Sequence, residues 1–283
     1  MRLCWFDDGR LGVVREGQVF DVTRVLDGLR TDTCPFISGD PVISHLEELR
    51  PVIEDVARSA PAQPISQTRF LSPVARPTKI IGTPANYLKH VEEAEAQSEV
   101  FTRRYVGSVL EQGLFLKAVS ALVGPSQGVR LRFPDRRTDH EMELGVIIGR
   151  KASQIDEAEA LDHVAGYAIA LDMVVRGPED RSFRKSIDTY AVLGPWLVTA
   201  DEIPDPGNLE FSLSVGGKIR QHSNTRFMIL SVARQIAWAS RFYTLWPGDI
   251  IMTGACEGVA QVHPGDVMHC FIERVGEMEV RVF

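Results

Sequence analysis

The chain has 283 residues, of which 44% are hydrophobic and 24% charged, and its formal net charge is −7 at pH 7. These fractions are those of an ordinary globular protein that is long enough to bury a core without disulfides or a structural metal. The acidic balance argues against a nucleic-acid partner, because such partners select a strongly basic surface.

The cysteines and the apolar runs indicate the compartment. The four cysteines are far apart and form no CxxC pair, so neither a disulfide framework nor a thiolate zinc site is expected; they are Cys4, Cys34, Cys256 and Cys270. The N-terminus becomes acidic at Asp7, too early for the apolar core of a signal peptide. No apolar run approaches the ~18 residues of a membrane helix. We therefore expect a cytoplasmic protein with reduced thiols and no membrane partner.

Residues 1–72 are predicted to form a small N-terminal α+β domain. Within it, residues 11–22 have the pattern of two short strands across a turn at Glu16-Gly17. Residues 44–60 have the apolar spacing of a helix. The proline-rich residues 61–77 cannot stay helical and are predicted to be an extended connector, so we place the domain boundary there.

Residues 73–283 are predicted to form the catalytic domain. It is expected to begin with a strand at 79–82 and a helix at 87–97. Beyond these, most apolar segments are short and bounded by Gly, Pro or Asp, as is typical of strands; they span 114–117, 143–148, 164–175, 193–198, 209–215, 249–252 and 267–272. One helix, at 229–242, interrupts them. This pattern predicts an α+β, mainly β domain with closed or sandwiched sheets.

Three acidic residues of this domain are candidate metal ligands. On a strand, Glu141 and Glu143 project from the same face about 7 Å apart at Cα. Asp172 ends the apolar segment 165–171, where a carboxylate is costly without a partner. Three carboxylates suit a hard divalent ion, Mg²⁺ or Mn²⁺, with Ca²⁺ also possible. The alternative is a solvated strand face, with Asp172 as a cap.

A second candidate pair lies on the predicted helix at 87–97. His90 and Glu93 are three residues apart, so they share one face and can touch. Glu93 could then fix the tautomer of His90 and make it a general base for water. The alternative is a weak ion pair on a surface helix.

Positive charge brackets the acidic residues. Arg130, Arg132, Arg136 and Arg137 precede them, Arg176, Arg181, Arg184 and Lys185 follow Asp172, and Lys117 ends an apolar run. An anionic substrate beside a metal ion needs both signs of charge, although each of these residues could also be an ordinary surface charge. Thr253 and Gly254 follow another apolar run and could present a hydroxyl and an amide to a ligand.

Residues 79–283 resemble the fumarylacetoacetate hydrolase-like family. The H-x-E-x-E…D motif of that family matches His140-Glu141-Met142-Glu143 and the later Leu171-Asp172. The resemblance implies that Glu141, Glu143 and Asp172 bind Mg²⁺ or Mn²⁺. It also implies a mixed β-roll or sandwich catalytic domain behind a small N-terminal α+β domain, and a homodimer.

Further family motifs carry the other candidate residues. The N-Y-x-x-H-x-x-E segment matches Asn86 to Glu93 and implies that His90 activates water and that Glu93 orients it. The K-S-[FI]-D segment matches Lys185 to Asp188, and the L-F-L-K strand matches Lys117. Arg176 matches a substrate-contacting arginine. By resemblance, Lys117, Arg176, Glu179, Thr253 and Gly254 contact substrate and Lys185 is catalytic.

The chain departs from the family at three places. Pro84-Ala85 replaces the usual G-[RL] before Asn86, which removes a backbone N–H at Pro84. The T-G-T-P-x-G-V turn is Thr253 to Val259 here, with Ala255 and Cys256 in place of Thr and Pro. Glu179 stands where a glutamine is common. These departures predict an unusual substrate.

The predicted function is divalent-metal-dependent hydrolysis of a C–C bond in a 2,4-dioxo acid, such as an acylpyruvate, a fumarylpyruvate or a diketo-sugar acid. His90 is expected to activate water, Lys185 to stabilise the oxyanion, and the metal to hold the leaving enolate. An oxaloacetate-type decarboxylase or a dienedioate isomerase could use the same site. A catalytically silent ligand-binding paralogue is the alternative from another class. In each case the partner is a small anionic keto acid.

Overall fold

The computed structural model describes residues 1–29, 39–97 and 107–283. Its α-helices are α1 (Pro41–Ser44), α2 (Leu46–Ala57), α3 (Leu88–Ala96), α4 (Val109–Gln112), α5 (Arg181–Lys185) and α6 (Val232–Phe242). Its first strands are β1 (Arg2–Phe6), β2 (Arg10–Arg15), β3 (Gln18–Asp21), β4 (Ala62–Pro64), β5 (Ile80–Gly82), β6 (Phe115–Lys117), β7 (Leu122–Val123), β8 (Thr138–His140) and β9 (Met142–Ile148). The others are β10 (Val164–Asp172), β11 (Val174–Val175), β12 (Ala191–Thr199), β13 (Glu210–Val215), β14 (Lys218–Asn224), β15 (Ile250–Met252), β16 (Ala260–Gln261), β17 (Val267–Ile272) and β18 (Gly276–Arg281).

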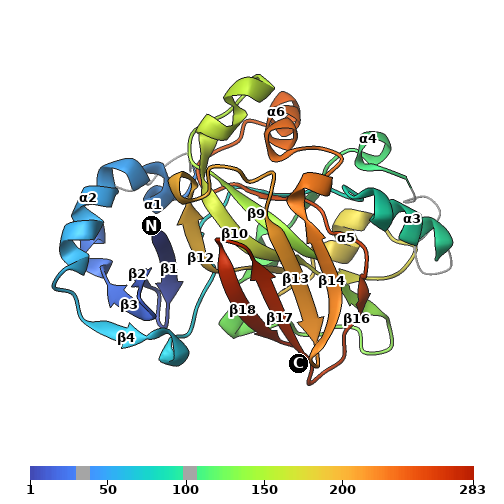
Figure 1. Cartoon of the computed structure of the whole chain (residues 1–283), viewed down its shortest axis with the longest axis horizontal. Helices are drawn as coiled ribbons and strands as arrows, with labels where there is room; N and C mark the ends of the chain where they lie inside the picture. Colours follow the sequence, from blue (N-terminus) through green and yellow to red (C-terminus); the bar gives the residue numbers. More distant parts are fainter. Residues whose placement is uncertain (30–38, 98–106) are drawn as a thin grey trace.

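One large sheet runs through the molecule in the order β4-β3-β2-β1-β12-β10-β9-β15-β5-β6, with β7 beside β12. The N-terminal strands join it through β1, which pairs antiparallel with β12. These strands and α2 lie at one end of the molecule in Figure 1. A four-stranded sheet, β14-β13-β17-β18, lies in front of β10 in the same view. The predicted α+β, mainly β fold with sandwiched sheets is confirmed.

The central strands of the large sheet are buried on both faces. Along β10, Ile169 and Leu171 point into a core shared with the four-stranded sheet, while Ala168 and Ala170 point into a second cluster on the opposite face. This explains why 164–172 is a nearly continuous apolar run rather than an alternating one. By contrast, β13 alternates between buried and more exposed residues, as expected for a strand with one covered face.

A third apolar cluster is built almost wholly from the first 57 residues, with α2 packed on β1 and β2 through residues such as Leu3, Leu11 and Ile53. The predicted hairpin at 11–22 is β2 and β3, and the predicted helix at 44–60 is α2. The connector at 61–77 begins with an extended segment, β4, which pairs with β3, but it is not extended throughout, because residues Ile65–Gln67 form a 3-10 helix. The domain boundary at residue 72 stays a prediction.

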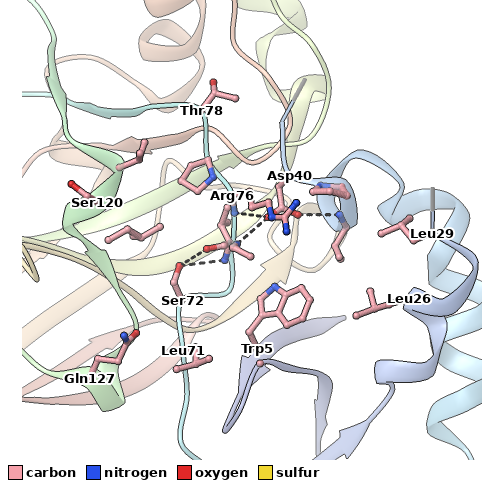
Figure 2. A pocket seen from close by; sticks show the side chains of 18 residues that line it. Trp5, Leu26, Leu29, Asp40, Leu71, Ser72, Arg76, Thr78, Ser120 and Gln127 are labelled. Atoms are coloured by element: carbon pink, nitrogen blue, oxygen red, sulfur yellow. Dashed lines mark hydrogen bonds between the residues drawn. The ribbon is translucent and has the colours of Figure 1, made fainter. Parts of the chain in front are cut away.

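A hollow of about 960 Å³ lies beside this connector (Figure 2). Trp5 and Leu26 line it from the N-terminal side, Arg76 lines it from the connector, and Thr78 lines it from just beyond the connector. Buried Asp40 fixes the connector there, because it accepts hydrogen bonds from the amides of Val42 and Ile43 in α1 and from those of Ala75 and Arg76. Such N-capping stabilises a helix start by about 1 kcal/mol. None of the predicted site residues is among those that line this hollow.

Candidate active site

The three predicted metal ligands converge where two neighbouring strands leave the large sheet. β9 and β10 pair antiparallel in the large sheet, and their continuations, β8 and β11, pair in a small sheet with β16. Glu141 lies in the break between β8 and β9, rather than within one strand as expected. Asp172 ends β10, and its N–H donates to the carbonyl of Glu141 at 2.8 Å. The point where β9 and β10 leave the large sheet therefore places Glu141 and Asp172 beside Glu143 of β9.

The carboxylates of Glu141, Glu143 and Asp172 form a buried cluster. One oxygen of each lies within 4.8 Å of the others. Their exposed fractions are 7%, 2% and 1%, so bulk water does not screen their mutual repulsion. Three buried carboxylate oxygens in reach of one point are the donor set that a hard divalent ion prefers. The residues present therefore fit Mg²⁺ or Mn²⁺, and their role as ligands stays a prediction.

Three cations contact this cluster. Lys185 of α5 lies between two of the acids, with Nζ 2.5 Å from Glu141 Oε2 and 2.6 Å from Asp172 Oδ2. Lys117 of β6 donates to the other oxygen of Asp172 and to the carbonyl of Tyr190. Arg176 Nη2 lies 3.1 Å from Glu141 Oε1. All three are predicted site residues, and the structure brings them together.

The surroundings push the pKa values of the two glutamates apart. Burial alone would raise the pKa of Glu141, but the charges of Lys185 and Arg176 outweigh it and hold that pKa below its usual range. Burial, reinforced by the charge of Asp172, raises the pKa of Glu143 well above its usual value. Glu143 accepts a hydrogen bond from the amide of Gly254 at 2.7 Å. Burial also lowers the pKa of Lys117.

The predicted base lies on α3, next to the cluster. His90 Nδ1 is 3.0 Å from Glu93 Oε2, and the amide of Gly258 donates to the other oxygen of Glu93 at 3.0 Å. His90 is only 6% exposed. It lies near enough to Glu141 to interact electrostatically with that carboxyl. The predicted pair therefore exists and faces the acids.

Asn86 holds the start of α3 in place. Its amide group donates to the carbonyls of Thr253 and Leu230, and its oxygen accepts the N–H of Leu230. The hydroxyl of Thr253 donates to the carbonyl of Leu144 in β9. Thr253 and Gly254 thus bind the protein's own β9, and their predicted contact with substrate stays untested. No role was predicted for Asn86 or Gly258, because each contacts residues that are far away in the sequence.

Arg176 and Glu179 each have a partner that the sequence analysis did not assign. Arg176 Nε is 2.7 Å from Asp139 Oδ2. Arg136 binds both oxygens of Glu179, at 2.9 and 2.7 Å. Asp139 lies two residues before Glu141, so strand periodicity could have placed it on the same face. Glu179 as a substrate contact stays a prediction.

Other predicted charges lie apart from the acids. Arg132 pairs with Asp188, and Arg130 lies over the ring of Phe283. Arg184 donates to the carbonyls of Val175 and Glu179, which braces α5. These arginines therefore act on the loops around the cluster.

The described cysteines are buried and free, and Cys34 lies outside the described residues. Burial raises the pKa of Cys256 to about 12, so this thiol in the altered 253–259 turn stays protonated. In the described part of the chain, no helix is both long and apolar enough to cross a membrane.

A β-rich domain with a buried carboxylate corner and a nearby histidine–glutamate pair defines a class of enzymes that act beside a divalent ion. The chain belongs to the fumarylacetoacetate hydrolase family: the family described as fumarylacetoacetate (FAA) hydrolase C-terminal matches residues 79–283. This confirms the resemblance. The first 78 residues lie outside that match.

Individual relatives extend the similarity. The chain is 47% identical to a maleylpyruvate hydrolase of Aquipseudomonas alcaligenes over 284 residues, or 100% of this chain and 99% of the relative. It is 36% identical to the human mitochondrial oxaloacetate tautomerase FAHD2A over 78% of this chain and 71% of that protein. A crystal structure of maleylpyruvate hydrolase from Sphingobium sp. SYK-6, in complex with manganese(II) and pyruvate, has a TM-score of 0.83. It is 39% identical and covers 100% of this chain and 98% of its own.

Proposed function

We propose that this protein is a divalent-metal-dependent hydrolase that cleaves a C–C bond in a 2,4-dioxo acid of the acylpyruvate type. The observation that carries the proposal is the buried cluster of Glu141, Glu143 and Asp172 with His90 and Glu93 beside it. The similarity to maleylpyruvate hydrolases along the whole chain supports this substrate class.

Glu141, Glu143 and Asp172 would hold the ion, Mn²⁺ or Mg²⁺. When bound, such an ion supplies Lewis acidity and a binding point for the keto-acid end of the substrate. The Sphingobium relative was crystallised with manganese(II) and pyruvate, which supports both the metal and the bound fragment. Arg176, which contacts Glu141 at the edge of the cluster, would bind the substrate's carboxylate.

His90 acts as the general base. Its Nδ1–H donates to Glu93, so Nε2 is the ring nitrogen that would accept the proton from water. The water oxygen attacks the distal carbonyl carbon and forms a C–O bond, and the bond between that carbon and the pyruvate unit breaks. The electron pair stays on the pyruvate unit, which takes up a proton to give pyruvate. Lys185 stabilises the negative oxygen during the attack.

The test is cleavage of an acylpyruvate panel, followed by loss of the β-diketo absorbance, with Mn²⁺, with Mg²⁺ and after exhaustive chelation. We expect activity with either metal and none after chelation, and we expect Glu141→Ala to be inactive. Cleavage that survives chelation would exclude the metal-dependent mechanism. Pyruvate should appear in equal amount to the substrate consumed.

Keto–enol isomerisation of oxaloacetate is a second candidate, because the human relative named for this activity is 36% identical over 78% of this chain. Decarboxylation of oxaloacetate needs no activated water, so His90→Ala should abolish hydrolysis and spare a decarboxylase. Ultraviolet spectra of the product distinguish an isomerase of oxaloacetate or of a dienedioate from a hydrolase. If wild type binds pyruvate and converts no member of the panel, the silent-paralogue alternative is favoured.

The proposal includes a homodimer in the cytoplasm. The described cysteines, all buried and free, suit a reducing compartment. Light scattering of the purified protein tests the dimer.

A further inference from the structure

Residues 136–139 hold Arg176 at three separate points. The N–H of Arg176 donates to the carbonyl of Arg137 at 2.8 Å. Arg136 Nη2 donates to the carbonyl of Arg176 at 2.9 Å. Arg176 Nε donates to Asp139 Oδ2 at 2.7 Å. The backbone and the side chain of Arg176 are therefore both fixed by one short segment.

Asp139 is the buried part of this segment. Its side chain is fully buried, and its second oxygen accepts from Arg137 Nε at 2.7 Å. Its backbone lies in β8, between Val174 of β11 and Gln261 of β16, so strand pairing on both sides sets its position. Burying a carboxylate is costly, and here two guanidinium groups compensate it.

The contact with Asp139 has a consequence for the cluster. With Nε held by Asp139, Nη2 of Arg176 reaches Glu141 Oε1 at 3.1 Å. The Arg176 side chain is only 11% exposed. An arginine that is held in one rotamer loses little entropy when it binds an anion. Asp139 therefore fixes the position and the rotamer of Arg176, the proposed substrate-binding arginine.

We propose that Asp139 is a positioning residue that acts through Arg176 on the binding of the keto-acid carboxylate. The inference rests on the proposed function, in which Arg176 receives that carboxylate. Asp139 itself touches no reacting atom. Its removal should weaken anion binding far more than it slows the chemical step.

The experiment is a double-mutant cycle of Asp139→Asn and Arg176→Met. The probe is pyruvate, titrated calorimetrically with saturating Mn²⁺, and KM and kcat are measured on an acylpyruvate. Losing one charge-assisted hydrogen bond should raise the pyruvate Kd and the KM of Asp139→Asn about tenfold. We expect kcat to stay within about threefold. In the Arg176→Met background, the same substitution should leave the pyruvate Kd unchanged, because the guanidinium group that Asp139 holds is no longer present.

Asp249→Asn is the matched control. Asp249 is also fully buried and paired, with Lys79, outside the carboxylate cluster. This variant should lower the melting temperature without raising the pyruvate Kd. If Asp139→Asn folds poorly, Asp139→Glu replaces it, since the longer side chain displaces Arg176 and should raise Kd in the wild-type background only.

Three results would overturn the inference: equal effects of the Asp139 substitution in both backgrounds, a lower melting temperature with unchanged Kd and KM, or no binding of pyruvate by wild type. Wild type that binds pyruvate but cleaves no acylpyruvate would overturn the proposed function alone. The binding cycle would still decide the role of Asp139.

Discussion

Lys185 occupies the place where the ion and the acids should meet, so we expect Lys185→Met to bind Mn²⁺ more tightly than wild type. Its Nζ lies 2.5 Å from Glu141 Oε2 and 2.6 Å from Asp172 Oδ2. An ion that takes these oxygens has to displace two charge-assisted hydrogen bonds, each worth about 1.5–3 kcal/mol. The freed ammonium regains hydration, so we assign a net competition of about 1.4 kcal/mol, or tenfold in Kd.

The same substitution should destabilise the metal-free protein. It removes a compensating charge from two buried carboxylates, and breaking a buried pair costs about 3–5 kcal/mol. Lys117 and Arg176 still contact these acids, so the lower end is expected. Saturating Mn²⁺ should recover most of the lost melting temperature, because ligand binding stabilises the folded state. Acylpyruvate hydrolysis should fall at least a hundredfold, as for other lost oxyanion donors.

Calorimetric titration of Mn²⁺ and thermal unfolding with and without Mn²⁺ measure both effects. Lys79→Met is the control, because Lys79 pairs with buried Asp249 outside the cluster. It should lower stability and leave the Mn²⁺ Kd unchanged. An Mn²⁺ Kd for Lys185→Met that is equal to or weaker than that of wild type would refute the competition argument.

Four further substitutions test local features. Ala85 has φ +45°, so Ala85→Gly should raise the melting temperature by relieving part of the about 1–2 kcal/mol cost of that conformation. The Arg50 hydrogen bond lowers the pKa of Asp201, so the stability lost in Asp201→Asn, below about 1 kcal/mol at pH 7, should begin to shrink below about pH 4, where the unfolded carboxylate takes up a proton, and should keep shrinking as the pH falls further in denaturant titrations. Glu143→Gln should abolish Mn²⁺ binding in calorimetry without lowering the melting temperature of the metal-free protein, whereas Glu141→Gln should lower it.

Local periodicity was enough to place most of the central strands, with Glu143 and Asp172 on them, although Glu141 lies in the break before β9. The apolar run ending at Asp172 and the alternation from Glu141 to Glu143 put carboxylates at strand ends, and the register of β9 against β10 brings them together. The predicted strand at 164–175 is in fact two, β10 and β11, because the chain turns into the small sheet at Met173. The residues of an apolar run do not show where the strand stops pairing with one sheet and begins to pair with another.

The missed elements depend on distant contacts. β14 carries mostly exposed polar residues, so it lacks the apolar alternation that predicts a strand. β1 and β18 form by pairing with β12 and with β17, and a pairing partner is not encoded in a short window. For the same reason, the roles of Asn86 and Gly258 could not be predicted, because each residue contacts a partner more than 140 residues away in the sequence. Short sequence motifs therefore predict which side chains carry the chemistry, whereas the residues that hold those side chains in place are known only from the tertiary structure.

The contacts of the three carboxylates differ in a way that explains why a divalent ion belongs there. Glu141 and Asp172 each contact lysine or arginine directly. Among the described residues, Glu143 has the amide of Gly254 as its hydrogen-bond donor and no ion-pair partner, and burial raises its pKa. If the only requirement at this position were stability, a neutral side chain in place of Glu143 would make the folded protein more stable. The buried charge is useful when an ion compensates it, and in the proposed function that ion and Arg176 would together let an acidic chain bind an anionic substrate.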